Sequence, residues 1–99
     1  MLSSKQRSQL KALANGEDAI IHIGKGGITE NVVKQASDAL RARELIKGRV
    51  SENSGITAAE ALNELAGLCF AEPVQSIGAR LVLYKENKEL SPDKRIRLI

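Results

Sequence analysis

At 99 residues the chain has room for one compact domain, 1–99, because two hydrophobic cores would each lack apolar surface. Hydrophobic residues make up 42% and charged residues 27%, and no stretch approaches the roughly 20 apolar residues that span a bilayer. The composition argues against a membrane protein, and the lone Cys69 excludes an intrachain disulfide. Because residues 1–10 are polar and lack the apolar core of a secretory signal, we expect a cytoplasmic protein.

Positive charge is in mild excess and is unevenly distributed. Fifteen lysines and arginines against twelve acidic residues give a formal net charge of +3, which permits nucleic-acid binding without requiring it. The first third of the chain is the basic end, with the cations Lys5, Arg7, Lys11, Lys25 and Lys34.

The first half of the chain predicts a helix, a strand and a second helix. Ser3 followed by Gln6 fits a capping box that opens a helix over 3–15. The Ile-rich run 19–23 lies between glycines and favours a buried strand. Thr29 then caps a second helix, whose apolar stripe is formed by Val32, Val33, Ala36 and Leu40.

The second half predicts a strand, a helix and a hairpin. The strand at 44–50 is weakened by Gly48. Thr57 and Glu60 form a capping box that starts the third helix, and Pro73 prevents its continuation. Two apolar runs separated by Gly-Ala-Arg then have hairpin spacing, at 74–77 and 81–85.

The resulting order, αβαβαββ, predicts an α+β fold with a mixed sheet of four strands. In a two-layer sandwich, right-handed crossovers would bring the helices together on one face of that sheet. For the tail, 91–99, the sequence leaves a folded and a flexible structure open.

A glycine-rich segment between the first strand and the second helix carries the strongest functional signal. Glycines at positions 24, 26 and 27 let a backbone approach a phosphate, the first amides of the helix point outward, and Lys25 adds a positive charge. The alternative is an ordinary tight turn. Neither a Walker loop nor a dinucleotide fingerprint is present, so a polynucleotide backbone fits better. The residues assigned to this site are Gly24, Lys25, Gly26, Gly27 and Thr29.

Cations on the flanking helices are candidates for the same footprint. They are Lys5, Arg7 and Lys11 on the first helix, and Lys34 and Arg41 on the second. Taken alone, they read as solvated helix faces, and only a shared location with the glycine loop would make them phosphate contacts.

The sequence gives no support for catalysis, metal binding or a cofactor. His22 has no second histidine or cysteine at ligand spacing, and Cys69 lies on an apolar helix face with no base beside it. Glu60 and Glu64 lie one helical turn apart, but the cap already accounts for Glu60. We therefore predict a protein that is not an enzyme, with no catalytic residues, no metal and no cofactor.

Four stretches, in this order and spacing, resemble the bacterial YhbY proteins, the single-domain form of the CRM (chloroplast RNA splicing and ribosome maturation) RNA-binding domain. They are Lys5-Gln6-Arg7 with Leu10, Leu13 and Ala14; 23–29; Glu44-Leu45-Ile46-Lys47; and 74–78 with 81–84. The resemblance implies a two-layer sandwich like the C-terminal domain of translation initiation factor three, with a Gly-x-x-Gly loop as the RNA contact. The chain departs from the family pattern at two positions. Arg43 stands where the family often has histidine, and Gly48 is expected to bend the edge formed by its strand.

The resemblance also implies a partner, ribosomal RNA in precursors of the large ribosomal subunit, and a role in their assembly; we expect a monomer. Only two aromatic residues, Phe70 and Tyr84, are present, so base stacking cannot dominate recognition. Two alternatives stay open: a KH-like binder of single strands, and a protein-binding adaptor on ribosome precursors that docks through the sheet or through Ile96, Leu98 and Ile99 of the tail. A nucleotide-binding enzyme is the weakest rival.

Overall fold

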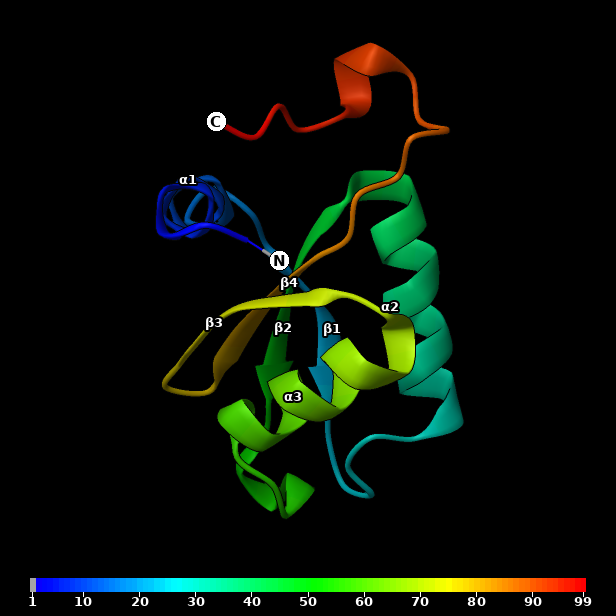
Figure 1. Cartoon of the computed structure of the whole chain (residues 1–99). Helices are drawn as coiled ribbons and strands as arrows, with labels where there is room; N and C mark the ends of the chain where they lie inside the picture. Colours follow the sequence, from blue (N-terminus) through cyan, green and yellow to red (C-terminus); the bar gives the residue numbers. More distant parts are fainter. Residues whose placement is uncertain (1) are drawn as a thin grey trace.

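Helices and strands follow one another in the predicted order αβαβαββ (Figure 1). The computed structural model describes residues 2–99, so Met1 of the predicted 1–99 domain lies outside the described residues. The elements are α1 (Ser4–Ala14), β1 (Ala19–Ile23), α2 (Glu30–Arg43), β2 (Leu45–Val50), α3 (Ala58–Cys69), β3 (Glu72–Ile77) and β4 (Arg80–Tyr84). Short 3-10 helices lie at Glu52–Ser54 and Pro92–Lys94.

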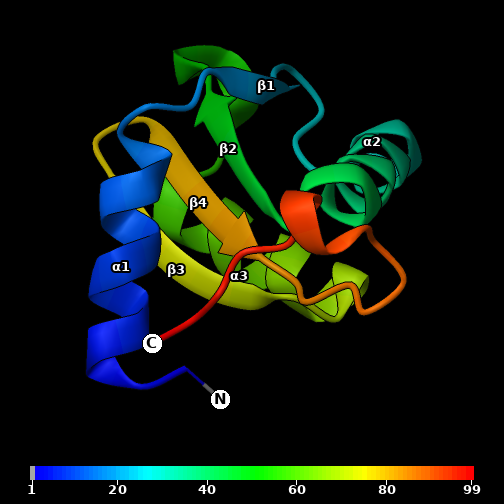
Figure 2. The same ribbon diagram turned by 90° about the horizontal axis from the view of Figure 1, so that it is seen from above.

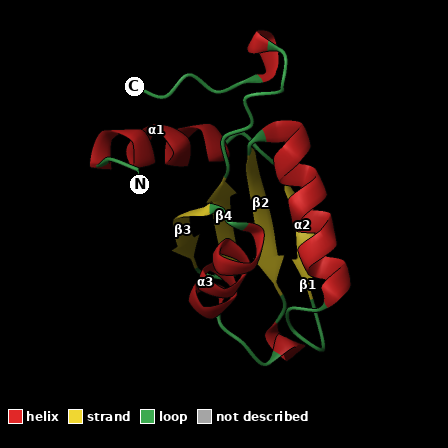
Figure 3. Ribbon diagram, turned by 45° about the vertical axis from the view of Figure 1, so that its right-hand side comes forward, coloured by secondary structure: helices red, strands yellow, loops and turns green. Residues whose placement is uncertain are grey.

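The strands form a four-stranded sheet in the order β1-β2-β4-β3 (Figure 3). β1 runs parallel to β2, whereas β4 is antiparallel to both of its neighbours, β2 and β3. The predicted α+β class with a mixed sheet is confirmed. β2 lies between β1 and β4, so the strand that carries Gly48 is an interior strand and not an edge.

Both faces of the sheet are covered. α2 and α3 pack on one face, around a core cluster that includes Ile23, Leu40 and Leu65. α1 lies on the other face (Figure 2). There Leu10 packs in a second cluster with Val82. The expectation that the helices share one face therefore holds for α2 and α3 but not for α1.

α1 covers a separate face because the apolar run of β4 contributes side chains to both faces of the sheet. Leu81 and Leu83 belong to the cluster under α2 and α3, while Val82 and Tyr84 belong to the cluster under α1. Successive side chains of a strand point to opposite faces, and a strand that is apolar on both sides has to be covered on both.

The predicted caps are present at all three long helices. Ser3 Oγ accepts the backbone N–H of Gln6 at 3.1 Å, and the Gln6 side chain accepts the N–H of Ser3 at 3.0 Å. Thr57 and Glu60 make the same reciprocal pair at α3. Hydrogen bonds from the backbone and side chain of Thr57 lower the pKa of the Glu60 carboxyl. At α2 the cap consists of the Thr29 hydroxyl alone, which accepts the backbone N–H of Val32.

Gly48 occupies a position with no room for a side chain. A Cβ there would lie 3.1 Å from Leu81 Cδ1 and 3.3 Å from the carbonyl oxygen of Ile21. Strand pairing continues on both sides of it, with Ile21 of β1 and with Leu81 of β4. The glycine therefore lets three strands approach closely and does not bend an edge.

The buried carboxylate of Glu44 links the end of α2 to the C-terminal segment, residues 86–99. Its side chain is 0% exposed, and its backbone φ is +65°. Oε2 accepts the N–H of Asn87 and Oε1 accepts the N–H of Ile96, both at 2.7 Å, while Arg95 Nε lies 3.7 Å from Oε2. A buried carboxylate is tolerated when it is paired and hydrogen-bonded in this way. Burial and the carboxylates of Glu44 and Glu86 raise the pKa of the neighbouring Tyr84 phenol.

Within the C-terminal segment, the tail 91–99, whose structure the sequence left open, packs against α1. Gln9 Nε2 donates to the carbonyl of Arg97 at 2.7 Å, and Gln9 Oε1 accepts the N–H of Ile99 at 3.0 Å. Ile96 and Leu98 pack on the cluster beneath α1. These contacts place the segment over the same face of the sheet as α1.

Replacing Gly48 tests the crowding between the three strands. Gly48→Ala should lower the free energy of unfolding by about 1–3 kcal/mol, because the added methyl group overpacks Leu81 and the Ile21 backbone. The control Gly67→Ala, in an exposed part of α3 with open space around it, should raise stability by about 0.5–1 kcal/mol. Urea unfolding followed by circular dichroism measures both. Equal stability of Gly48→Ala and the parent would contradict this interpretation.

Replacing Glu44 tests the attachment of the C-terminal segment. Glu44→Gln removes the charge opposite Arg95 and one of two acceptors, so the free energy of unfolding should fall by about 1–3 kcal/mol. The backbone amides of Asn87 and Ile96 should also exchange faster with deuterium. Glu89→Gln, an exposed control, should change stability by no more than about 0.5 kcal/mol. Unchanged exchange at both amides in Glu44→Gln would refute the role of the carboxylate.

Candidate nucleic-acid interface

The glycine-rich segment forms a tight β-turn between β1 and α2. The N–H of Gly27 donates to the carbonyl of Gly24 at 3.0 Å, which closes the turn. Gly26 has φ +98° and Gly27 has φ +67°, both in the left-handed region that side chains disfavour. At these two positions glycine is required by the backbone, whereas Gly24 has no such φ.

The turn presents Lys25 to solvent next to the N-terminus of α2. Lys25 and Gly26 are exposed, while Gly27 is buried near Ile56. Thr29 Oγ1 accepts the N–H of Val32 at 3.3 Å. The positive end of the helix dipole therefore lies at the end of the loop that carries Lys25, an arrangement that favours an anion. Glu30 in the first turn of α2 opposes this effect with its own negative charge.

An open depression adjoins the turn at the end of the sheet. Its lining includes Gly24 from the turn, His22 and Arg49 from the strands, and Ser51 and Asn53 from the segment that follows β2. The N–H of Ser51 donates to the carbonyl of Ile23 at 2.9 Å, which holds that segment against the start of the turn. The depression thus connects the turn with the exposed ends of β1 and β2.

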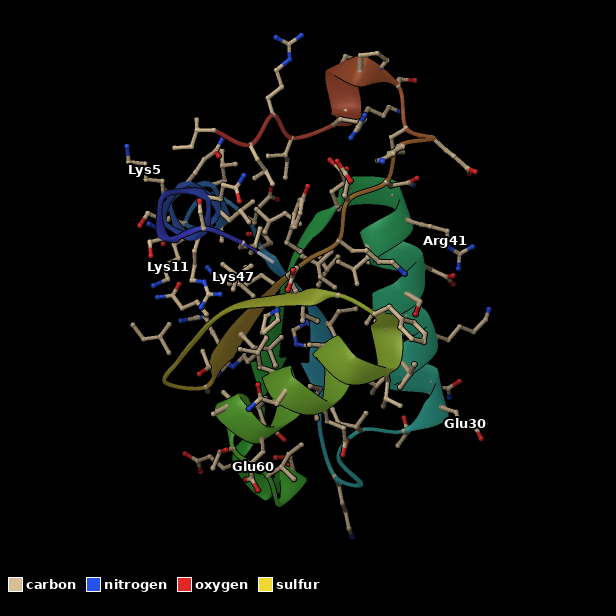
Figure 4. All side chains as sticks on the ribbon, in the orientation of Figure 1. Lys5, Lys11, Glu30, Arg41, Lys47 and Glu60 are labelled. Carbon is tan, nitrogen blue, oxygen red and sulfur yellow. The ribbon has the colours of Figure 1, made fainter. Side chains whose placement is uncertain are left out.

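The structure does not bring the predicted cations of α1 to the turn. Lys5 and Lys11 are labelled beside α1 in Figure 4, at the opposite end of the sheet from the loop that joins β1 to α2. Arg7 lies on the same helix. The shared location on which these three assignments depended is absent, because α1 packs on the other face, near the start of β1.

The two predicted cations of α2 stand at different distances from the turn. Lys34 lies one helical turn after Glu30, whereas Arg41 lies eleven residues after it, about 17 Å along the axis. Both pair with the exposed Asp38, Lys34 at 3.8 Å and Arg41 at 2.7 Å. Exposed pairs of this kind contribute little to stability. Lys34 belongs to the end of α2 that follows the turn. Arg41 belongs to the far end of α2.

The sheet brings further cations close to the turn, which the sequence alone did not single out. Arg49 of β2 pairs in register with His22 of β1 and with Arg80 of β4, and all three side chains are exposed. The alternation of buried Gly48 and Val50 with exposed Arg49 could have marked Arg49 as outward-facing. Its position opposite Arg80 depends on strand register, which the sequence does not reveal.

The other residues weighed for chemistry form no catalytic or metal site among the described residues. Cys69 is buried, and Ser37 Oγ donates to its sulfur at 3.4 Å. His22 is exposed, and the described residues contain no group of three or more potential metal ligands. Tyr84 is buried, whereas Phe70 is 85% exposed, with Lys85 Nζ 5.9 Å from its ring centre.

Within residues 2–99, no helix combines the length and apolar character that a membrane span requires.

Comparison with known proteins identifies a family. The sequence profile of the CRS1 / YhbY (CRM) domain matches residues 2–85, from the segment before α1 to the end of β4. The C-terminal segment that Glu44 holds lies beyond this match.

Individual relatives match along nearly their whole length. The YqeI protein of Bacillus subtilis (strain 168), provisionally named an RNA-binding protein, is 40% identical over 98 residues, 99% of each chain. A Haemophilus influenzae protein named an RNA-binding protein is 36% identical over 88 residues, 89% of each chain. The solution structure of SAV1595 from Staphylococcus aureus, provisionally described as RNA-binding, aligns with a TM-score of 0.78 and 40% identity over 100% of both chains.

Proposed function

This chain belongs to the CRS1 / YhbY (CRM) domain family, and we propose that it binds structured RNA by gripping the phosphate backbone at the turn 24–27. Relatives named as RNA-binding proteins, similar over nearly the whole chain, support RNA as the partner. One observation carries the assignment to the turn. Glycines 26 and 27 have left-handed backbones and carry no side chain, and they follow the exposed Lys25 in the loop that leads into α2.

In this proposal a phosphate is held by charge and by backbone amides. Lys25 contributes a mobile positive charge, the start of α2 contributes its dipole, and the glycines allow close approach. Thr29 fixes the first turn of the helix, and Lys34 adds a second cation one turn further on. None of these groups reads a base edge, so binding should depend on shape and salt more than on sequence.

The biological partner in this proposal is ribosomal RNA within precursors of the large ribosomal subunit. The support for it is the resemblance to the bacterial YhbY proteins, which associate with such particles. Action in the cytoplasm as a monomer, from one domain spanning 1–99, belongs to the same proposal. We propose no catalytic role and no cofactor.

The adaptor alternative loses one of its two docking surfaces, the tail. Docking through the tail needs Ile96, Leu98 and Ile99 to be free, but Ile96 and Leu98 pack on the cluster beneath α1. Ile99 is 72% exposed, and its backbone is bonded to Gln9. A KH-like grip on single strands uses the same turn, so it differs from our proposal only in the RNA that is bound.

Charge reversal at the turn tests the proposal. Lys25→Glu should weaken binding to a fluorescently labelled RNA hairpin on the order of tenfold and lower the salt slope by about one, because one phosphate contact is lost. Fluorescence anisotropy over a series of KCl concentrations measures both quantities. The loss should be similar for hairpins of different sequence, since the turn contacts backbone.

A matched control is Lys88→Glu, which makes the same charge change at an exposed site in the C-terminal segment. It should bind within about twofold of the parent, since it alters only long-range electrostatics. If Lys25→Glu and Lys88→Glu behaved alike, the turn would not be the contact. If the parent bound duplex DNA as well as RNA, the preference for RNA would be wrong.

A further inference from the structure

A row of polar side chains crosses three strands beside the turn. His22, Arg49 and Arg80 occupy paired positions on β1, β2 and β4, a span of about 10 Å at the usual strand spacing. Their flanking residues Ile23, Val50 and Leu81 lie in the cluster beneath α2 and α3. Alternation along the strands therefore turns the row to the face that carries α1.

α1 covers only part of that face. Its buried residues, Leu10 and Ala14, pack with Leu45 and Val82, toward the start of β2 and the end of β4. The row lies beyond this contact, at the other end of both strands, where His22, Arg49 and Arg80 are all exposed. In Figure 1 α1 stands beside the upper part of the sheet, away from the loop at the bottom.

The two arginines of the row face each other across paired strands. Arg49 and Arg80 are direct partners across antiparallel strands, where like charges are destabilising. Within residues 2–99 neither arginine takes part in an ion pair. An anion placed over the pair would relieve the repulsion.

The positive charge continues toward α1. Lys47 projects on the same face, and its Nζ donates to the carbonyl of Ala14, the last residue of α1, at 3.3 Å. Lys11 lies one helical turn before Ala14, and Figure 4 labels it on the same side of the sheet as Lys47. Glu17 and Asp18 follow α1 in the chain and reduce the charge at this end.

The row also adjoins the turn. His22 and Arg49 line the open depression together with Gly24. One carboxylate, Glu52, shares that lining, so cations outnumber anions along the path from Lys11 through Lys47, Arg49 and Arg80 to the turn. A linear polyanion fits this path better than a small anion does, because the cations are spread over several strands and a helix.

We infer that His22, Lys47, Arg49 and Arg80 form a second backbone-binding surface, the sheet-face site, which holds a further segment of the RNA gripped at the turn. This inference rests on the proposed RNA-binding function and extends it to a substrate class. An RNA that folds back on itself presents two backbone segments and can occupy both surfaces. A short single strand can occupy only one.

The test separates the sheet-face site from the turn by substituting each alone. Arg49→Thr with Arg80→Thr removes both opposed charges and leaves residues that suit strands. Affinity for a labelled RNA hairpin should fall at least about tenfold, with a salt slope lower by about two. The urea midpoint should stay the same or rise, because the like-charge repulsion is gone. The control, Lys88→Thr with Lys94→Thr, makes the same charge change at exposed sites in the C-terminal segment and should bind within about twofold of the parent.

The outcomes distinguish the two proposals. If the double variant binds the hairpin like the parent while Lys25→Glu is weakened, the sheet-face site is wrong and the turn remains the RNA contact. If the parent itself shows no preference for RNA over duplex DNA, the proposed function fails and the sheet-face site fails with it. Should the double variant unfold, Arg80→Gln alone gives the same test, with a slope expected to fall by about one; a slope equal to that of the parent would overturn the inference.

Discussion

The carboxylate of Glu44 is fully buried, and the groups around it are arranged to satisfy it. It lies between the last turn of α2 and the first residue of β2, with a left-handed backbone that turns the chain into the sheet. Its carbonyl accepts the N–H of Lys85 at 2.8 Å, and its side chain holds the amides of Asn87 and Ile96. Breaking these bonds would leave a charge unsolvated, so the helix end, the end of β4 and the C-terminal segment are joined at one point.

The two faces of the sheet are covered to different extents. α2 and α3 cover one face along its length, while α1 and the C-terminal segment cover only one end of the other. The uncovered end carries Arg49 and Arg80 and adjoins the turn at Gly24. The same packing arrangement therefore covers the sheet at the Glu44 end and leaves the side chains at the opposite end exposed.

The proposed mode of binding follows from which side chains reach solvent. Tyr84 is buried, and Phe70 lies at the end of α3, away from the turn. A ring platform for stacked bases is therefore absent from the described face, and the groups left to meet RNA there are cations and backbone amides. Both interact with phosphate, which explains why we expect recognition of RNA shape more than of sequence.

Much of the local structure could be predicted from the sequence, because caps, glycine turns and apolar periodicity each act within a few residues. The capping boxes at Ser3 and Thr57, the turn before Thr29 and the order of elements were found in this way. The face taken by α1, the partners of Glu44 and the pairing of Arg49 with Arg80 were not, since each joins residues far apart in the chain. Strand register and helix placement are decided by which apolar surfaces bury one another, and only the tertiary structure specifies them.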